Sequence, residues 1–131
     1  MQYLLMICDN ERRWDNLTPE QAESTMARYR ALTQELAQSG HYKGGSQLQR
    51  TTSATTVRVR DGKRQTTDGP FAETREQLGG YFLIEARDLD EAISIAERIP
   101  AAETGSIEIR PLVPMQKAPA SASNLATTAT A

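Results

Sequence analysis

The stretch Gln2 to Cys8, QYLLMIC, decides the fold. Large apolar side chains occupy both alternating sets of positions, so both faces of a strand formed here would be apolar. A second stretch of the same kind, Tyr81 to Ile84 (YFLI), lies late in the chain. We therefore expect two central strands of one sheet, each of which needs cover on both sides.

A charged, polar connection over residues 9–16 and then a long helix are predicted between these strands. Thr18 is a suitable N-cap, Pro19 suits the first helical position, and Gln21 stands three residues after the cap. Apolar residues then recur at helical spacing, and Gly40 is placed to end the helix in a left-handed conformation. The pattern predicts one helix of about twenty residues.

A second, shorter helix and a last strand are predicted near the end of the domain. Asp88 followed by Glu91 repeats the capping pattern, and Pro100 is expected to end the helix. The predicted apolar stripe consists of Leu89, Ala92, Ile93, Ala96 and Ile99. Residues 106–110 alternate apolar and charged side chains, which is typical of a half-buried edge strand.

The middle of the chain predicts a hairpin. Residues 57–60 alternate valine and arginine, Asp61 and Gly62 form a two-residue turn signal, and residues 63–67 return. Residues 41–49 are expected to form an irregular edge strand, and residues 68–80 a loop with one helical turn.

The order of these elements predicts an α+β protein with a ferredoxin-like βαββαβ sandwich over residues 1–113. Two helices can cover only one face of the sheet, which leaves a patch of Leu, Ile, Met and Phe on the other. We expect a homodimer packed face to face, a dimeric α+β barrel with a cavity between the sheets. Residues 114–131, rich in Ala, Ser and Thr, are expected to form a flexible tail.

Composition excludes several classes of function. The net charge is -2 from 15 basic and 17 acidic residues, which does not favour a dedicated nucleic-acid binder. The N-terminal apolar run is too short to span a membrane, and it lacks the basic lead of a signal peptide. The single cysteine, Cys8, is expected in the core and fits a reducing cytoplasm.

The run Asp68 to Glu76, DGPFAETRE, with LGGY just beyond it, resembles the family named for its Asp-Gly-Pro-Phe motif, which is related to the YCII proteins. The resemblance covers residues 1–113. It implies a dimeric α+β barrel, a cavity suspected of being an active site, and, for some relatives, association with an extracytoplasmic-function sigma factor. YCII relatives with a suspected His/Asp pair carry the histidine in the first helix, where this chain has Tyr29.

Asp68 is the first candidate catalytic residue. Pro70 restricts its own backbone and that of Gly69, and Phe71 is expected to pin the loop by burying its ring, so the carboxylate is held stiffly. On the functional interpretation Asp68 faces the cavity as a general base, with Phe71 and Tyr81 as an apolar wall. On the alternative interpretation it accepts hydrogen bonds from nearby backbone amides.

His41, the single histidine, is the second candidate, because its ordinary pKa suits proton transfer near neutral pH. The alternative is a surface residue or a partner of the helix C-terminus. Glu73 and Glu76 are secondary candidates for binding or acid-base chemistry, with solvated charges as the alternative. No ligand spacing indicates a metal, and no motif indicates a cofactor.

Two functions remain open from the sequence. One is the binding of a small metabolite between the sheets, with cofactor-free proton transfer if the protein is an enzyme, which the sequence does not decide. The other is a non-catalytic regulatory or interaction module; a purely structural role also stays open. The basic residues Arg58, Arg60, Lys63 and Arg64 either contact phosphates or an acidic partner, or form a solvated edge.

Overall fold

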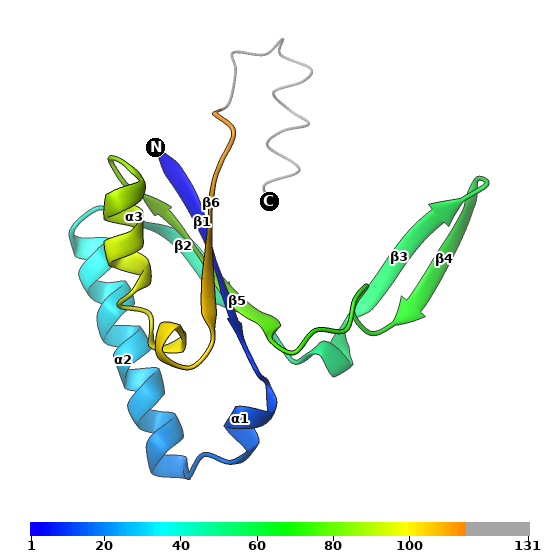
Figure 1. Cartoon of the computed structure of the whole chain (residues 1–131), viewed down its shortest axis with the longest axis horizontal. Coiled ribbons are helices and arrows are strands. Elements are labelled where there is room, and N and C mark those ends of the chain that lie inside the picture. Colours follow the sequence, from blue (N-terminus) through cyan, green and yellow to red (C-terminus); the bar gives the residue numbers. More distant parts are fainter. Residues whose placement is uncertain (115–131) are drawn as a thin grey trace.

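Four antiparallel strands form the main sheet of the computed structural model, which describes residues 1–114 (Figure 1). The central strands are β1 (Gln2–Asp9) and β5 (Gln77–Glu85), and β2 (Tyr42–Gln47) and β6 (Ser106–Pro111) form the edges. The strand order is β2-β5-β1-β6. Both central strands predicted from their apolar runs are therefore confirmed, and the chain is an α+β protein.

The long helix α2 (Pro19–Gln38) begins and ends as its sequence predicts. Thr18 and Gln21 form a reciprocal capping box, in which each side chain accepts a hydrogen bond from the other residue's backbone N–H. Gly40 follows the helix with φ 80°, and the His41 N–H donates to the Leu36 carbonyl at 2.9 Å. The helix end is thus closed by its own backbone.

The second helix, α3 (Leu89–Ala96), starts at Asp88, whose side chain accepts from the Glu91 N–H. The predicted stripe is partly wrong, because Leu89 and Ile93 are exposed and Ile95 is buried instead. The buried face centres on small residues, which let the helix approach the sheet closely. A 3₁₀ helix, η2 (Pro100–Glu103), follows α3 where only an end was expected.

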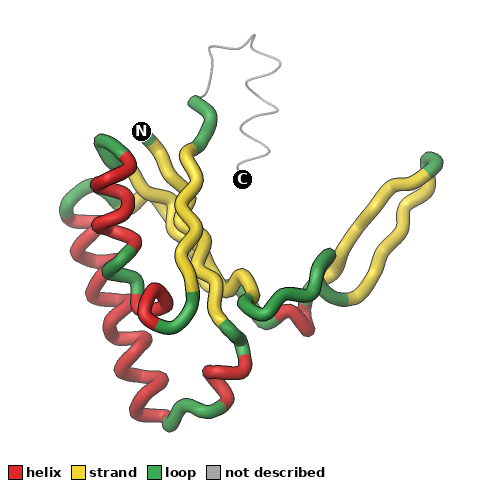
Figure 2. The backbone as a smooth tube through the Cα atoms, in the orientation of Figure 1, coloured by secondary structure: helices red, strands yellow, loops and turns green. Residues whose placement is uncertain are grey.

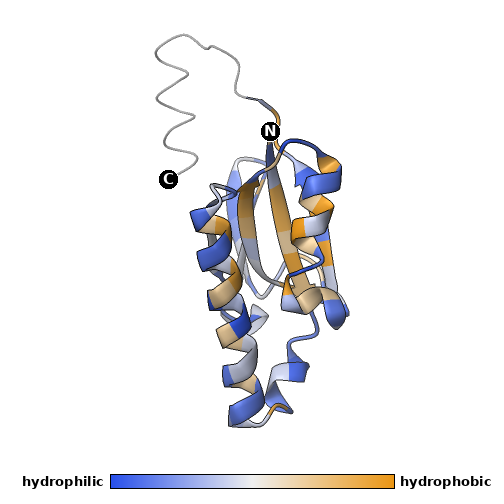
Figure 3. Cartoon of the chain, turned by 90° about the vertical axis from the view of Figure 1, so that its left-hand side faces the viewer, coloured by the Kyte–Doolittle hydropathy of each residue, from blue (hydrophilic) through white to orange (hydrophobic). Residues whose placement is uncertain are grey.

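The helices cover one face of the main sheet (Figure 3). Alternate side chains of β1 and β5 point to that face and are buried: Tyr3, Leu5, Ile7, Phe82 and Ile84. They pack with side chains of α2, of α3 and of the segment just after α3: Leu32 and Leu36, then Ala92, Ile95 and Ala96, and finally Ile99. The hydrophobic core of residues 1–114 therefore lies between the sheet and the helices.

The other face of the main sheet has no cover from residues 1–114. The register of β1 against β5 places on this open face the apolar side chains Leu4, Met6, Cys8, Leu78, Tyr81 and Leu83. All are partly or fully exposed. The expected apolar patch is present. The prediction that it contains isoleucine and phenylalanine is wrong, because Ile7, Ile84 and Phe82 point to the helices.

The predicted hairpin forms a second, separate sheet of β3 (Thr55–Arg60) and β4 (Lys63–Asp68), which we call the arm (Figure 2). Asp61 and Gly62 have φ of 53° and 72°, so the two-residue turn lies in the left-handed region that glycine favours. The arm extends away from the main sheet on the side opposite the helices (Figure 1).

Short elements in the connections differ from the predictions. A helical turn, α1 (Arg12–Asp15), occupies the segment expected to be a plain connection, and η1 (Thr51–Ser53) precedes the arm. The loop 69–76 contains no helical turn, and β5 starts at Gln77, earlier than predicted. The expected flexible tail lies, except for its first residue, outside the described residues.

Candidate functional site

A cavity of about 590 Å³ lies between α2, α1 and the end of the sheet where β2 stops and β5 starts. It is on the helix side of the sheet, whereas the sequence predicted a cavity between the sheets of two copies. Its size falls in the range of small-molecule sites. Four aromatic residues line it: Trp14, Tyr29, Tyr42 and Phe82.

Phe82 forms the apolar floor of the cavity. The rings of Tyr29 and Tyr42 meet it nearly perpendicularly, at centroid distances of 6.5 Å and 5.5 Å. Burial raises the pKa of Tyr29; a hydrogen bond with the Ala101 backbone opposes this shift, and the Asp9 carboxylate adds to it. Burial also raises the pKa of Tyr42. Both hydroxyls therefore keep their protons at neutral pH and are available as hydrogen-bond donors.

Ion pairs form the polar wall of the cavity. The Asp9 carboxylate accepts from the Thr104 hydroxyl at 2.7 Å and from the Arg13 Nε at 3.3 Å. Arg28 of α2 pairs with Glu103 of η2 at 2.5 Å, and this contact lowers the pKa of Glu103. All four charged residues line the cavity. They place two cations and two anions around an aromatic floor.

Glu11 connects the short helix α1 to the segment before the arm. Its carboxylate accepts from the Thr51 N–H at 2.7 Å and from the Thr51 hydroxyl at 2.9 Å. Arg50 pairs with Asp15 at the end of α1 and so lowers the pKa of Asp15. These contacts hold residues 48–51 against α1, which closes one side of the cavity entrance.

This arrangement suits a ligand of mixed polarity. An apolar part can pack on Phe82 and Trp14, while Tyr29 and the arginines donate hydrogen bonds to oxygen atoms. Tyr29, which stays protonated, can also donate a proton, and the Asp9 carboxylate can accept one. The cavity therefore offers both a proton donor and a proton acceptor.

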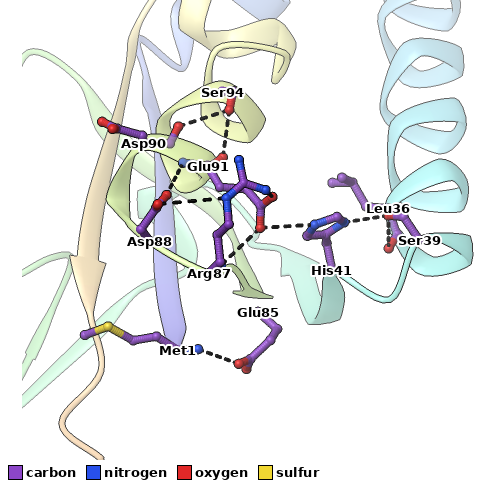
Figure 4. A network of polar contacts seen from close by, with 10 residues as sticks. All are labelled: Met1, Leu36, Ser39, His41, Glu85, Arg87, Asp88, Asp90, Glu91 and Ser94. Carbon is purple, nitrogen blue, oxygen red and sulfur yellow. Dashed lines mark hydrogen bonds and ion pairs between the residues drawn. The ribbon is translucent and has the colours of Figure 1, made fainter.

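The predicted catalytic residue His41 lies elsewhere, in the contact between α2 and α3 (Figure 4). Its Nδ1 is 2.7 Å from the Ser39 hydroxyl, and its Nε2 is 3.3 Å from Glu91 Oε1. The Arg87 N–H also donates to Glu91 and is the main cause of its lowered pKa. In one chain, His41 thus joins the end of α2 to the start of α3.

Asp68 is the last residue of β4 and is exposed at the base of the arm. The Gly69 N–H donates to the Ala54 carbonyl at 2.7 Å, and the Thr56 hydroxyl donates to the Gly69 carbonyl at 2.8 Å. These bonds fix the backbone beside Asp68. One chain does not bring Asp68 and His41 together, because the arm and the α2–α3 contact are separate parts of the molecule (Figure 1).

The predicted binding residues also lie outside the cavity. Pro70, Phe71 and Glu73 are exposed in the loop after the arm, and Phe71 is 80% exposed. The expectation that Phe71 buries its ring is wrong for one chain, because the loop lies beyond the main sheet with no surface beneath it. Tyr81 lies on the open face opposite Met6.

Cys8 is on the open face too, not in the core as predicted. On the neighbouring strand β6, Ser106 lies opposite Cys8. Burial raises the pKa of Cys8, and the carboxylates of Glu108 and Glu76 act in the same direction. The thiol therefore stays protonated at neutral pH and is a poor nucleophile.

Sequence reasoning missed the residues that line the cavity. Met26 and Tyr29 recur at helical spacing along α2, which by itself indicates only a buried helix face. Trp14 lies in the charged connection that the sequence predicts before that helix. The sequence does contain a signal for this site: the large aromatic residues Trp14 and Tyr29 lie on either side of the helix start, among many charged residues. Only the fold shows that they face one space.

Two further findings concern residues 1–114. No group of three His, Cys, Asp or Glu side chains in this range is placed to hold a metal ion. None of the helices in the same range combines the length and the apolar character that a membrane crossing requires.

Comparison with known proteins shows the family of this chain. Residues 1–116 match the model of the YCII-related domain. The chain is also 36% identical over 114 residues to an uncharacterized protein, R00369, of Rhizobium meliloti (strain 1021), an alignment that covers 86% of this chain and 92% of that protein. The chain therefore belongs to the family of proteins with a YCII-related domain.

Proposed function

We propose that this protein binds a small ligand of mixed polarity in the cavity between α2 and the main sheet, and that it does so as a homodimer. The observation that carries the binding proposal is the cavity itself: about 590 Å³ of space with an aromatic floor and a wall of ion pairs. An interaction module without a ligand needs no such space, so the cavity supports ligand binding over that alternative.

Tyr29 is the residue to which we assign the central polar contact with the ligand. It combines a ring packed on Phe82 with a protonated hydroxyl near Asp9. In this role it donates a hydrogen bond to a ligand oxygen and, if the ligand is transformed, the proton. Asp68 and His41 remain predictions from the sequence, and the contacts of one chain do not support a shared site for them.

The homodimer is supported by the open face of the main sheet. Leu4, Met6 and Leu83 form an apolar strip along both central strands, with Tyr81 beside them. A soluble monomer seldom exposes so continuous an apolar strip, and a second copy buries it by a two-fold axis. The cavity lies on the opposite side of the sheet, so dimer formation leaves it open to ligand.

A thermal-shift screen of the full chain against a library of small carboxylates, phosphates and sugars tests the binding proposal. A ligand present at a hundredfold excess over its Kd contributes about 2.7 kcal/mol, which raises Tm by on the order of 10 °C. Each compound that raises Tm is then measured with two variants of α2. Thr25→Trp fills the cavity, whereas Ala27→Trp adds the same ring on the exposed side of the helix.

The proposal expects the shift to disappear in Thr25→Trp and to persist in Ala27→Trp. Tyr29→Phe should weaken binding by about tenfold, the value of one hydrogen bond, while Tyr81→Phe on the open face should not. Ligands that stabilise Thr25→Trp as strongly as the unmodified protein would show that this cavity is not the binding site.

A further inference from the structure

No other element within residues 1–114 forms a supporting layer for the arm. Its two strands pair with each other and with no strand of the main sheet. A hairpin of two strands is marginally stable in water unless another surface packs against it. The side chains of the arm are nearly all exposed in the single chain. The described part of the chain therefore supplies no surface that stabilises the arm, and both faces of the arm are open to another molecule.

One face of the arm is suited to such packing. Val57 and Val59 point to the same face, and they are 58% and 61% exposed. Phe71, at the base of the arm, is 80% exposed. Single exposed apolar residues are common, but here three large ones occur on a segment without its own core. These residues mark the arm as a contact surface.

The arm lies on the side of the open face. Figure 1 shows the helices and the arm on opposite sides of the main sheet. Figure 3 looks at the molecule from the helix side, so the arm lies behind the sheet in that view. The arm, with strands of six residues, is about 20 Å long at the usual rise per residue. Stacked sheets are about 10 Å apart, so the arm reaches past a second sheet docked on the open face.

Charge favours a second copy as the partner. Residues 55–68 contain four basic and two acidic residues, a net charge of +2. The whole chain has a net charge of -2, so the rest of the chain carries -4. The arm of one copy is therefore attracted to the body of another, and opposite charges on the two surfaces speed their association.

From these observations we infer that the arm packs in trans against a second copy of this chain, with Val57 and Val59 on the body of the partner. The inference rests on the homodimer of the proposed function and goes beyond it. The open faces alone make a flat contact, whereas each arm encloses the edge of the other copy. The loop after the arm, with Phe71, is then brought to the interface.

Site-specific photo-crosslinking tests the inference on the full chain. Val59 is replaced by benzoylphenylalanine, and a matched variant carries the same group at Thr67, which lies on the opposite face of the arm. Labelled (¹⁵N) and unlabelled chains are mixed before irradiation, so that peptides linked between two copies carry one label each. We expect links from position 59 to the body of the partner and few from position 67.

A second pair of variants measures the contribution of the valines. Val57→Ser combined with Val59→Ser should raise the Kd of the dimer by tenfold or more, because apolar area is lost from the interface. Gln65→Ser combined with Thr67→Ser, on the other face, should change it less than threefold. Equal effects of the two pairs would count against the proposed contact.

The outcomes separate the arm from the dimer. Light scattering could show a dimer while all crosslinks from position 59 stay within one chain. This result would overturn the trans packing of the arm but not the homodimer. A monomer by light scattering would overturn both. Neither result bears on ligand binding, which the Thr25→Trp comparison tests on its own.

Discussion

Gly45 sets how closely the edge strand β2 approaches β5. A Cβ at this position would lie 2.6 Å from the Tyr81 carbonyl oxygen and 2.8 Å from the Tyr42 hydroxyl. The first of these atoms belongs to the backbone and cannot move aside without opening the sheet. The absence of a side chain here therefore allows Tyr42 to lie against Phe82 in the cavity.

Gly45→Ala should lower the free energy of unfolding by about 1–3 kcal/mol, because the added methyl group overpacks the strand pair. Gly44→Ala is the matched control, since a Cβ there meets nothing within 4 Å. Urea denaturation of both variants at one protein concentration measures the difference. Equal stability of the two variants would show that β2 and β5 are not so closely packed.

Glu91 should contribute to the dependence of stability on pH. Its pKa in the folded protein is below the ordinary 4.5, because Arg87 and His41 favour the carboxylate. A lowered pKa adds stability above pH 4.5, and this stability is lost as the pH falls through the folded pKa. The free energy of unfolding of Glu91→Gln should therefore fall less steeply than that of the unmodified protein as the pH is lowered below 4.5.

Thermal unfolding between neutral and acidic pH measures this effect, which is small because the ion pair of Glu91 with the exposed Arg87 is screened by solvent. Glu97→Gln, at the other end of α3, is the control. If Glu91→Gln and the unmodified protein lose the same stability between neutral and acidic pH, Glu91 does not contribute to the pH dependence.

At the scale of elements, the N-terminal cap of α2 is the clearest local determinant. Thr18→Ala removes the side-chain acceptor of the Gln21 N–H and should cost about 1 kcal/mol of stability. Thr52→Ala in η1 changes the same residue type at an exposed position and should cost much less. Urea denaturation distinguishes the two, and equal costs would mean that the capping box does not stabilise the helix.

Local chemistry explains which elements could be predicted. Thr18, Pro19 and Gly40 mark the bounds of α2, and the Asp61-Gly62 turn marks the hairpin, because these signals act over a few residues. The position of the arm outside the main sheet has no such signal. It depends on contacts between distant segments, which the order of residues does not encode locally.

The candidate site was less predictable for the same reason. Asp68 and Phe71 stood out as a motif, yet the motif lies at the base of the arm and not in the cavity. Asp9, Tyr29 and Phe82 come from three different elements and form a site only when the helix lies over the sheet. Spacing along the chain therefore could not identify them as one group.

At the scale of the whole molecule, the uncovered face and the unsupported arm have one explanation in a second copy. Leu83→Glu places a charge in the apolar strip of the open face and should produce a folded monomer. Leu89→Glu, which changes an exposed leucine of α3 instead, should remain dimeric. Both variants should keep their secondary structure by circular dichroism, so that a change of mass reports association alone.

Light scattering of the unmodified full chain at micromolar concentration tests the dimer most directly. We expect a molar mass twice that of the 14.5 kDa chain, and for Leu83→Glu the mass of one chain. A single 14.5 kDa species for the unmodified protein would contradict it.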